Sequence, residues 1–245
     1  MKIDIDTSVE VNGIKNRGSP TTTLRQDLVR SLGGDSAYPY TLSRIVLVDT
    51  GGTERDYATI STTSWSFSSV TNGYRATATF QIQGTASYTC NRIRIYGSTS
   101  LYFEYTLPSS ITVTSSTIVT VTVTITVTAS ISHGSGGTNV STTMYTTLGE
   151  YIVRMMCTGA YKGTKPDRVA LFYGTTLITT LTGTVSTDLI YVKVVVNWSW
   201  TPTSTTTINA YQYRFEDGSP IAEVSFDPLD LGGGLTHTWQ LTILL

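Results

Sequence analysis

The stretch STIVTVTVTITVTAS, Ser116 to Ser130, places an apolar residue at every second position and mostly threonine between them. Successive side chains of a β-strand point to opposite faces, so this alternation predicts one long strand with an apolar face and a threonine face. Valine, isoleucine and threonine all have high strand propensity. We expect the apolar face to be buried and the threonine face to meet water or a second β surface. The apolar positions are Val119, Val121, Val123, Ile125 and Val127.

This strand carries nothing that would discourage pairing with another chain. No proline, lysine or glutamate occurs between Ser115 and Ser130, and long uncharged edge strands invite association. We therefore expect the strand to be central in its sheet, or else to be paired across a subunit boundary. A strand of this kind suits a protein that works in an assembly.

The composition narrows the possible partners. Of the 245 residues, 13% are charged and 40% are hydrophobic, and the formal net charge is −1. Nucleic-acid binders and proteins of anionic membrane surfaces carry basic patches, so we expect no nucleic-acid partner. The first twenty residues are too polar for a signal peptide, and the chain has no apolar run of the length that spans a bilayer. We therefore expect no membrane insertion.

The chain contains two cysteines, Cys90 and Cys157. Two cysteines do not make a disulfide framework for a chain of this length. One bridge between them is an open alternative, and we favour two buried free thiols.

Two segments have the spacing of amphipathic helices. In TLRQDLVRSLGG, residues 23–34, leucine recurs at every fourth position, and TLGEYIVRMMCTG, residues 147–159, repeats that apolar stripe. Thr23 and Thr147 are the expected N-caps, and the glycines that follow each segment are the expected stops. We expect each stripe to be buried against the strands of its own half of the chain. The stripes consist of Leu24, Leu28, Leu32, Leu148, Ile152 and Met156.

The two helical segments align without a gap. Leu148 follows Leu24 by 124 residues. The same offset aligns RIVL, residues 44–47, with RVAL, residues 168–171. Further along the chain the offset falls to 118 and then to 116, with the changes in loops, where insertions are tolerated. We interpret this pattern as an internal tandem duplication.

The sequence therefore predicts an all-β protein built from two tandem antiparallel β-sandwich units, jelly-roll-like in arrangement, each with one short helix. Short β-branched and aromatic runs separated by Gly, Ser, Asn and Asp indicate the strands. The segment ISHGSGGTNVST is typical of a flexible linker. The expected divisions are an N-terminal arm at 1–19, a first β-sandwich unit at 20–130, a Gly/Ser linker at 131–142 and a second β-sandwich unit at 143–245.

No combination of residues has the spacing of a catalytic or metal site. His133 and His237 are the only histidines, and neither is accompanied by ligands at metal-site spacing. Two groups of carboxylates do not match a calcium loop, and we interpret them as solvated. We predict no catalytic, cofactor-binding or metal-binding residues, and we predict that the protein is not an enzyme. The carboxylates are Asp4, Asp6, Glu10, Asp227 and Asp230.

Tyrosines gather in matching parts of the two halves. An amphipathic ring suits a position with one wet end, so packing in the core and at subunit interfaces is the favoured interpretation. A carbohydrate-binding platform is the alternative. The tyrosines are Tyr96, Tyr102, Tyr105, Tyr211 and Tyr213.

Three stretches carry a resemblance to a known group of proteins. They are RVALFYGTT at 168–176, FEDGSPIAEVSFDPLDLGGGLTHTWQLTI at 215–243 and RIRIYGSTSLYFEYTLPSSITVTSSTIVTVTVTITV at 92–127. Their turns and final alternating strand, following a short helix, resemble those of β-sandwich virion structural proteins of tailed phages and archaeal viruses. The chain departs from that group by duplicating the unit. The resemblance implies a structural role on a particle surface or tail, with no catalytic residues to carry over.

We expect a virion structural protein, namely a capsid decoration, turret, head-fibre or tail component, located in the virion. It would act as a symmetric homo-oligomer attached to other virion proteins of the capsid or tail, since its scarce charge opposes the approach of identical chains only weakly. The alternative is a carbohydrate- or receptor-binding β-sandwich module, whose ligand would be a glycan on a host surface.

Overall fold

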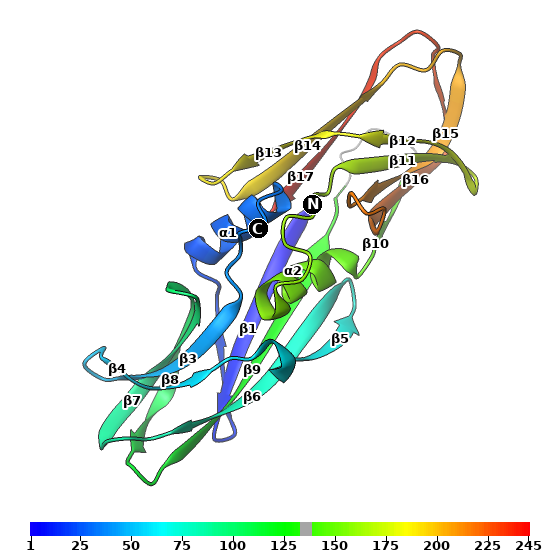
Figure 1. The fold of residues 1–245 in the computed structure, drawn as a ribbon. Helices are drawn as coiled ribbons and strands as arrows, with labels where there is room; N and C mark the ends of the chain where they lie inside the picture. Colours follow the sequence, from blue (N-terminus) through cyan, green and yellow to red (C-terminus); the bar gives the residue numbers. More distant parts are fainter. Residues whose placement is uncertain (133–138) are drawn as a thin grey trace.

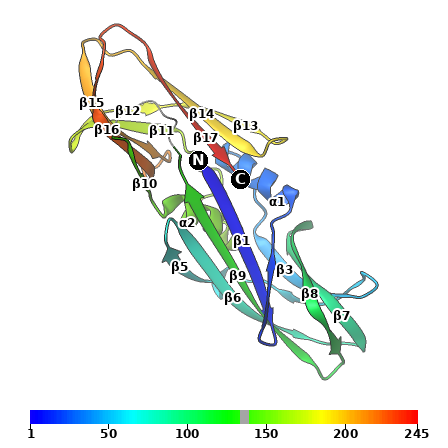
Figure 2. The same ribbon diagram turned by 180° about the vertical axis from the view of Figure 1, so that it is seen from behind.

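The computed structural model describes residues 1–132 and 139–245. Strands hold 59% of the described residues and helices 11%, so the expected all-β class is confirmed. The described strands form three sheets, which Figures 1 and 2 show arranged along an elongated molecule. A large sheet runs along its length, and a smaller sheet lies toward each end.

The large sheet has eight strands, and it joins residues from both ends of the chain. One pairing in this sheet is parallel, between the first and the last strand of the chain, and the other pairings are antiparallel. The strands in order are β13 (Thr184–Asp188), β14 (Lys193–Trp200), β17 (His237–Leu244), β1 (Lys2–Val11), β9 (Ile118–Ser130), β6 (Gly73–Gln83) and β5 (Ser66–Val70), with β2 (Ile14–Gly18) paired to β1.

The two smaller sheets are antiparallel and repeat one strand order. One contains β4 (Glu54–Thr59), β3 (Leu42–Asp49), β7 (Tyr88–Gly97) and β8 (Ser100–Val113), in that order. The other contains β12 (Thr176–Thr182), β11 (Arg168–Tyr173), β15 (Thr206–Arg214), β16 (Pro220–Leu231) and β10 (Ser141–Met144). The second, third and fourth strands of each sheet therefore occupy the same places along their own half of the chain. A 3-10 turn, η1 (Thr62–Ser64), lies between β4 and β5.

The Val/Thr strand is β9, and it lies in the middle of the large sheet. β1 pairs along one edge and β6 along the other. The side chains of Val121, Val123 and Ile125 are completely buried, while Thr122 and Thr124 between them are half-buried. The expected burial of the apolar face and the expected central position are both confirmed. Because both edges of β9 are already paired, this strand has no edge left for another subunit.

The N-terminal arm predicted for residues 1–19 is instead a pair of strands. β1 runs antiparallel to β9 from the pair Lys2 and Ser130 to the pair Val11 and Val121. The reason lies in its own alternation, since its apolar residues face the core while the acidic residues between them point outward. The linker predicted at 131–142 falls partly on residues 133–138, which lie outside the described residues.

The two helices are α1 (Thr22–Leu32) and α2 (Thr147–Thr158). The N-cap of α1 is Thr21, whose Oγ1 accepts a hydrogen bond from the amide of Leu24 at 3.3 Å, so the expected cap at Thr23 is wrong by two residues. Thr147, the second expected cap, is the first residue of α2. The expected stops are confirmed at Gly33 and at Gly159, which takes the left-handed conformation with φ 74°. All six stripe residues are completely buried.

Each helix covers strands of the other half of the chain. α1 packs against β8 and also against β13 and β14, whereas α2 packs against β6 and β9. The expectation that each stripe is buried against its own half is therefore only partly right for both helices, because α1 contacts β8 and α2 contacts β16 within their own halves. The glycine in α2 is one physical reason, because a Cβ on Gly149 would lie 2.8 Å from the carbonyl oxygen of Val127. Without that side chain, the helix can approach the sheet closely.

The helices meet each other at positions that are equivalent in the sequence alignment. The hydroxyl of Ser31 in α1 lies 3.6 Å from the sulfur of Met155 in α2, and the two residues are 124 apart. α1 also reaches a turn of the second half, where Gln26 donates a hydrogen bond to the carbonyl of Leu189 at 3.0 Å. The buried apolar residues consequently form one continuous core that includes both halves.

Candidate functional site

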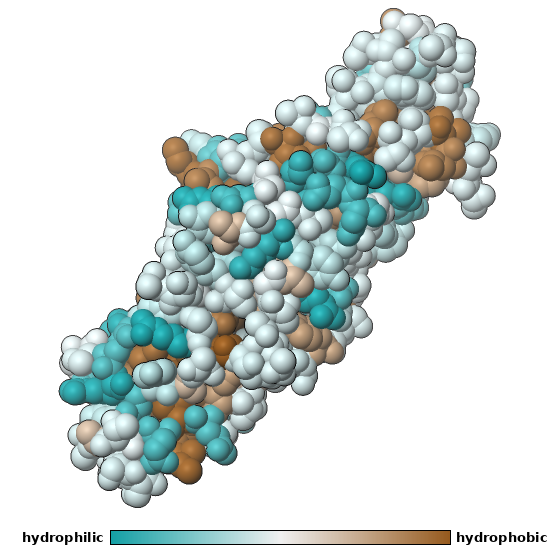
Figure 3. Space-filling model, viewed as in Figure 1, coloured by the Kyte–Doolittle hydropathy of each residue, from teal (hydrophilic) through white to brown (hydrophobic). Residues whose placement is uncertain are grey.

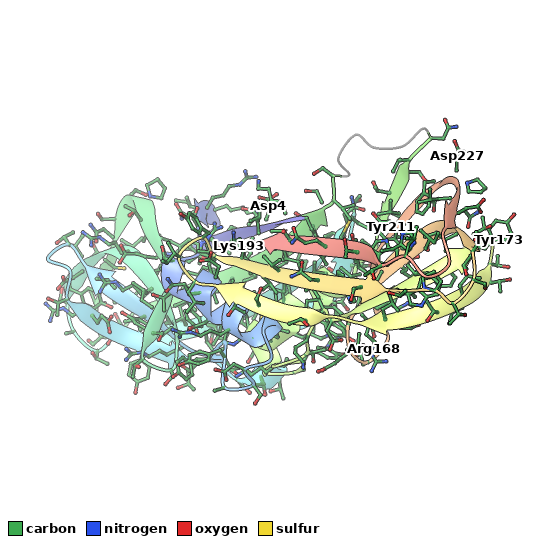
Figure 4. All side chains as sticks on the ribbon, turned by 90° about the horizontal axis from the view of Figure 1, so that it is seen from above. Asp4, Arg168, Tyr173, Lys193, Tyr211 and Asp227 are labelled. Atoms are coloured by element: carbon green, nitrogen blue, oxygen red, sulfur yellow. The ribbon has the colours of Figure 1, made fainter. Side chains whose placement is uncertain are left out.

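A groove opens in the second half, where the large sheet faces β15 and β16. It encloses about 700 Å³, within the range usual for ligand sites. The edge of β17 forms one wall, and aliphatic and aromatic side chains line most of the rest. Figure 4 shows two of the lining residues, Tyr211 and Asp227, toward the same end of the molecule and away from Asp4. The aromatic lining consists of Tyr211, Tyr213, Phe226 and Trp239.

The backbone of β17 presents its hydrogen-bonding groups to this groove. The amide of Leu245 donates to Val192 on the β14 side at 3.1 Å, whereas the amide of Leu244 donates to Met1 on the opposite side at 3.0 Å. Neighbouring residues of a strand point their N–H and C=O groups to opposite edges. Thr238, Gln240 and Thr242 therefore direct theirs to the side of Met1, which is the groove side.

Only the C-terminal end of that edge is paired with a described strand. β1 pairs with β17 through Lys2 and Leu244, and the amino group of Met1 donates to the carbonyl of Thr242 at 2.8 Å. Nearer the start of β17, the hydroxyl of Tyr213 donates to the carbonyl of Gln240 over 3.4 Å. No described strand pairs with this edge between His237 and Ile243.

The tyrosine hydroxyls around the groove are hydrogen-bond donors. Burial raises the pKa of Tyr211. Burial, together with the neighbouring Tyr211, also raises the pKa of Tyr213. Both phenols therefore stay protonated at neutral pH and can donate hydrogen bonds. At the rim, Asn139 donates to a carboxylate oxygen of Asp227 at 3.1 Å.

The tyrosines singled out in the sequence are buried, as expected for packing. Tyr96, Tyr102 and Tyr105 belong to the first half and do not line the groove. The hydroxyl of Tyr102 donates to Asp27 at 2.7 Å, which ties β8 to α1. Of these five tyrosines, Tyr211 and Tyr213 line the groove, and the two residues are 7% and 5% exposed.

The histidines and carboxylates are spread over the molecule. His133 lies outside the described residues, and His237 is half-buried on β17, with its Nε2 3.4 Å from the carbonyl of Gly232. Asp4 forms an exposed ion pair with Lys2 at 2.8 Å. In the described parts of the chain, no three His, Cys, Asp or Glu side chains gather as metal ligands would. The other carboxylates singled out in the sequence are exposed, namely Asp6, Glu10, Asp227 and Asp230.

The cysteines are both free and buried, so the structure decides against a bridge between Cys90 and Cys157. Burial raises the pKa of both thiols. A thiol held in its neutral form is a poor nucleophile.

The sequence did not predict the groove, although one signal of it was present. Trp239 takes the place of Val123 when β17 is aligned with β9 at an offset of 116 residues. Val123 is completely buried beneath paired strands, whereas Trp239 is only half-buried. A large aromatic residue in place of valine indicates a different neighbour, but not which one.

No protein-family model, curated protein sequence or solved structure matches the chain. No helix within residues 1–132 and 139–245 is long and apolar enough to cross a lipid bilayer.

Proposed function

We propose that the chain is a tandem duplication of one jelly-roll-like β-sandwich unit, folded as the intramolecular counterpart of a two-fold dimer. The repeated strand order of the smaller sheets supports this proposal. The contact between Ser31 and Met155 supports it further, since equivalent residues meet on the axis of a two-fold pair.

We propose that the protein is a non-catalytic structural component of a virus particle that acts by self-association and attachment. The observation that carries the assembly role is an open sheet edge in the second half. β12 is an edge strand with no charged residue, and Leu177 and Ile178 on it are 50% and 36% exposed. Figure 3 shows hydrophobic surface at the end of the molecule where β11 and β12 lie.

The corresponding edge strand of the first half carries charged residues. β4 has the sequence ERDYAT and occupies the same place in its sheet as β12. Glu54 lies 3.7 Å from Arg44, and Arg55 lies 2.6 Å from Asp49. Charged edge strands resist pairing with other chains, whereas uncharged ones promote it. The contrast between the two halves favours association through the second half.

Mass measurement in solution tests the assembly role. We expect the wild-type protein to form a homo-oligomer at high concentration and Leu177→Lys to be monomeric, because the lysine would stand on the open edge. Tyr57→Lys is the matched control, since Tyr57 is 63% exposed on the charged edge strand β4. Its mass should equal that of the wild type. A wild-type protein that remains monomeric at high concentration would contradict the proposal.

The virion location is supported by the resemblance of the strand and turn patterns to β-sandwich virion proteins. Detection of the protein in purified particles, and of capsid or portal genes beside its own gene, would test the location. Absence of the protein from the particles would overturn it.

The aromatic lining of the groove favours a second candidate function, namely binding of a carbohydrate or receptor. Trp239 and Phe226 are half-buried in the groove, and aromatic faces bind sugars through their apolar surfaces. A glycan array with the wild type and Trp239→Ala would test this candidate. Binding that is lost in the variant would support it.

A further inference from the structure

We propose that the groove binds an extended segment of another protein, which adds to the edge of β17 as an antiparallel strand. This inference deepens the proposed attachment function, on which it rests, by naming the chemistry of the partner. Strand addition of this kind takes affinity from backbone hydrogen bonds and specificity from alternate side chains.

The first half of the chain shows what occupies the equivalent edge. At an offset of 116 residues, β17 aligns with β9, and Leu241 aligns with Ile125. β9 pairs with β6 on one edge, as β17 pairs with β14. Along the other edge of β9, β1 pairs with it over the whole length of β1. The same edge of β17 meets β1 only at its end, through Leu244.

The side chains of β1 show what the described residues of the second half do not supply beside β17. Ile3, Ile5, Val9 and Val11 are at most 8% exposed and fill the side of the core next to β9. Beside β17 no described strand supplies such residues, and the described residues leave a groove of about 700 Å³ there. The edge from His237 to Leu241 is about 16 Å long at 3.3 Å per residue, enough for a short strand.

The backbone of the groove wall selects a polypeptide over a sugar. Thr238 and Gln240 direct N–H and C=O groups toward the groove, at the spacing that a strand requires. Tyr211 and Tyr213 are nearly buried, so their ring faces do not form an exposed platform for a sugar. The fitting partner is therefore an extended segment with apolar residues at alternate positions, free of proline where it meets β17.

A synthetic peptide with the sequence of β1, KIDIDTSVEV, is the direct probe. When it is added to the full-length protein, we expect saturable binding and slower hydrogen exchange at the amides of Thr238 and Gln240. A spin label on the peptide's N-terminus should broaden the resonances of Leu241 more than those of His237, because the added strand is antiparallel. Replacing the second isoleucine and the second valine of the peptide by aspartate should weaken binding by about tenfold or more.

The matched control places the change in the peptide, so that folding of the protein is not affected. Two peptides carry N-methyl groups on alternate residues, in the two possible registers. One register blocks the amides that face β17 and should abolish binding, whereas the other blocks the outward amides and should leave binding unchanged.

Three results would overturn the inference. The first is no binding of the peptide, or equal binding of both methylated forms. The second is a glycan that binds in the groove and competes with the peptide. The third is a dimer in which a second copy already protects Thr238 and Gln240 from exchange. The mass and particle measurements of the proposed function use no peptide, so failure of one proposal can be distinguished from failure of the other.

Discussion

At the scale of single residues, Tyr151 shows how one side chain joins several parts of the second half. Its ring stacks on Tyr161 with centroids 3.9 Å apart and on Phe215 with centroids 4.4 Å apart. Its hydroxyl donates to Asp217 at 2.6 Å and lies 2.9 Å from the hydroxyl of Ser219. Tyr151 thus connects α2 to the turn before β16 through both packing and hydrogen bonds.

Tyr151→Phe should lower the free energy of unfolding by about 0.5–1.5 kcal/mol at pH 8, because stacking is retained and the hydroxyl bonds are lost. Burial and the bond to Asp217 raise the pKa of Tyr151 to about 12. A raised pKa stabilises the fold below the unfolded value of about 10, and the effect is lost as the pH rises to 12.

Chemical unfolding of both proteins between pH 8 and pH 12 provides the measurement. The difference between wild type and variant should shrink across the upper part of this range. A difference that stays constant to pH 12 would show that the hydroxyl does not titrate as expected. The difference between the two proteins is the informative quantity, because effects of pH that are common to both cancel in it.

At the scale of elements, each helix packs against strands of both halves of the chain. Leu28 on α1 is completely buried, and α1 packs on β13 and β14 as well as on β8. Gly149 on α2 lies against the backbone of β9 and β6. A change on either helix therefore tests the contact between the two halves of the chain as well as the helix itself.

Leu28→Ala should destabilise the protein by about 2–5 kcal/mol, as expected for a large apolar side chain removed from a packed core. Thr23→Ala is the control, because Thr23 is exposed and the cap is Thr21. The control should change the stability by less than about 0.5 kcal/mol. Thermal melts measure both, and an unchanged melt for Leu28→Ala would place this face of α1 outside the core.

Gly149→Ala should also destabilise, although alanine in place of glycine normally favours a helix by about 1 kcal/mol. The added Cβ would lie 2.8 Å from the oxygen of Val127 and 2.9 Å from the amide nitrogen of Tyr74, and backbone atoms cannot easily move aside. We expect a cost of about 1–3 kcal/mol, measured by denaturant unfolding. Arg25→Ala, at the equivalent position of α1, should be nearly neutral. A more stable Gly149→Ala variant would show that α2 has room to shift.

At the scale of the whole molecule, the two halves depend on each other. α2 belongs to the second half of the chain yet covers β6 and β9 of the first half, and the last strand, β17, meets the first strand, β1. The terminal strands are also joined by the bond from the amino group of Met1 to Thr242. The protein should therefore unfold as one cooperative unit rather than as two independent domains.

Separate fragments 1–132 and 139–245 should each fail to fold alone, because each exposes apolar strand faces that the other fragment's helix covers. Mixing the two fragments should restore the strand signal in circular dichroism and a cooperative melt. Either fragment melting cooperatively by itself, near the temperature of the intact protein, would contradict this dependence.

The sequence by itself determined the local features. Alternation in residues 116–130 predicted the strand and its buried face, the spacing of Leu24, Leu28 and Leu32 predicted a helix, and glycine predicted where the helices end. These features depend on residues close together in the chain, which the sequence shows directly. The cap of α1 was placed two residues late because several threonines in succession can each cap a helix.

The tertiary structure alone decided how these elements combine. It placed β1 beside β9 and packed each helix against strands of the other half as well as of its own half. It also left the edge of β17 between His237 and Ile243 without a described partner strand, beside a groove lined by Tyr211, Phe226 and Trp239. Alternation states that a strand has an apolar face, but not which strand lies beside it, because many pairings would bury the same face. The partner of each element is selected by packing between residues far apart in the chain, and the groove lies where that selection leaves one edge of β17 without a described partner strand.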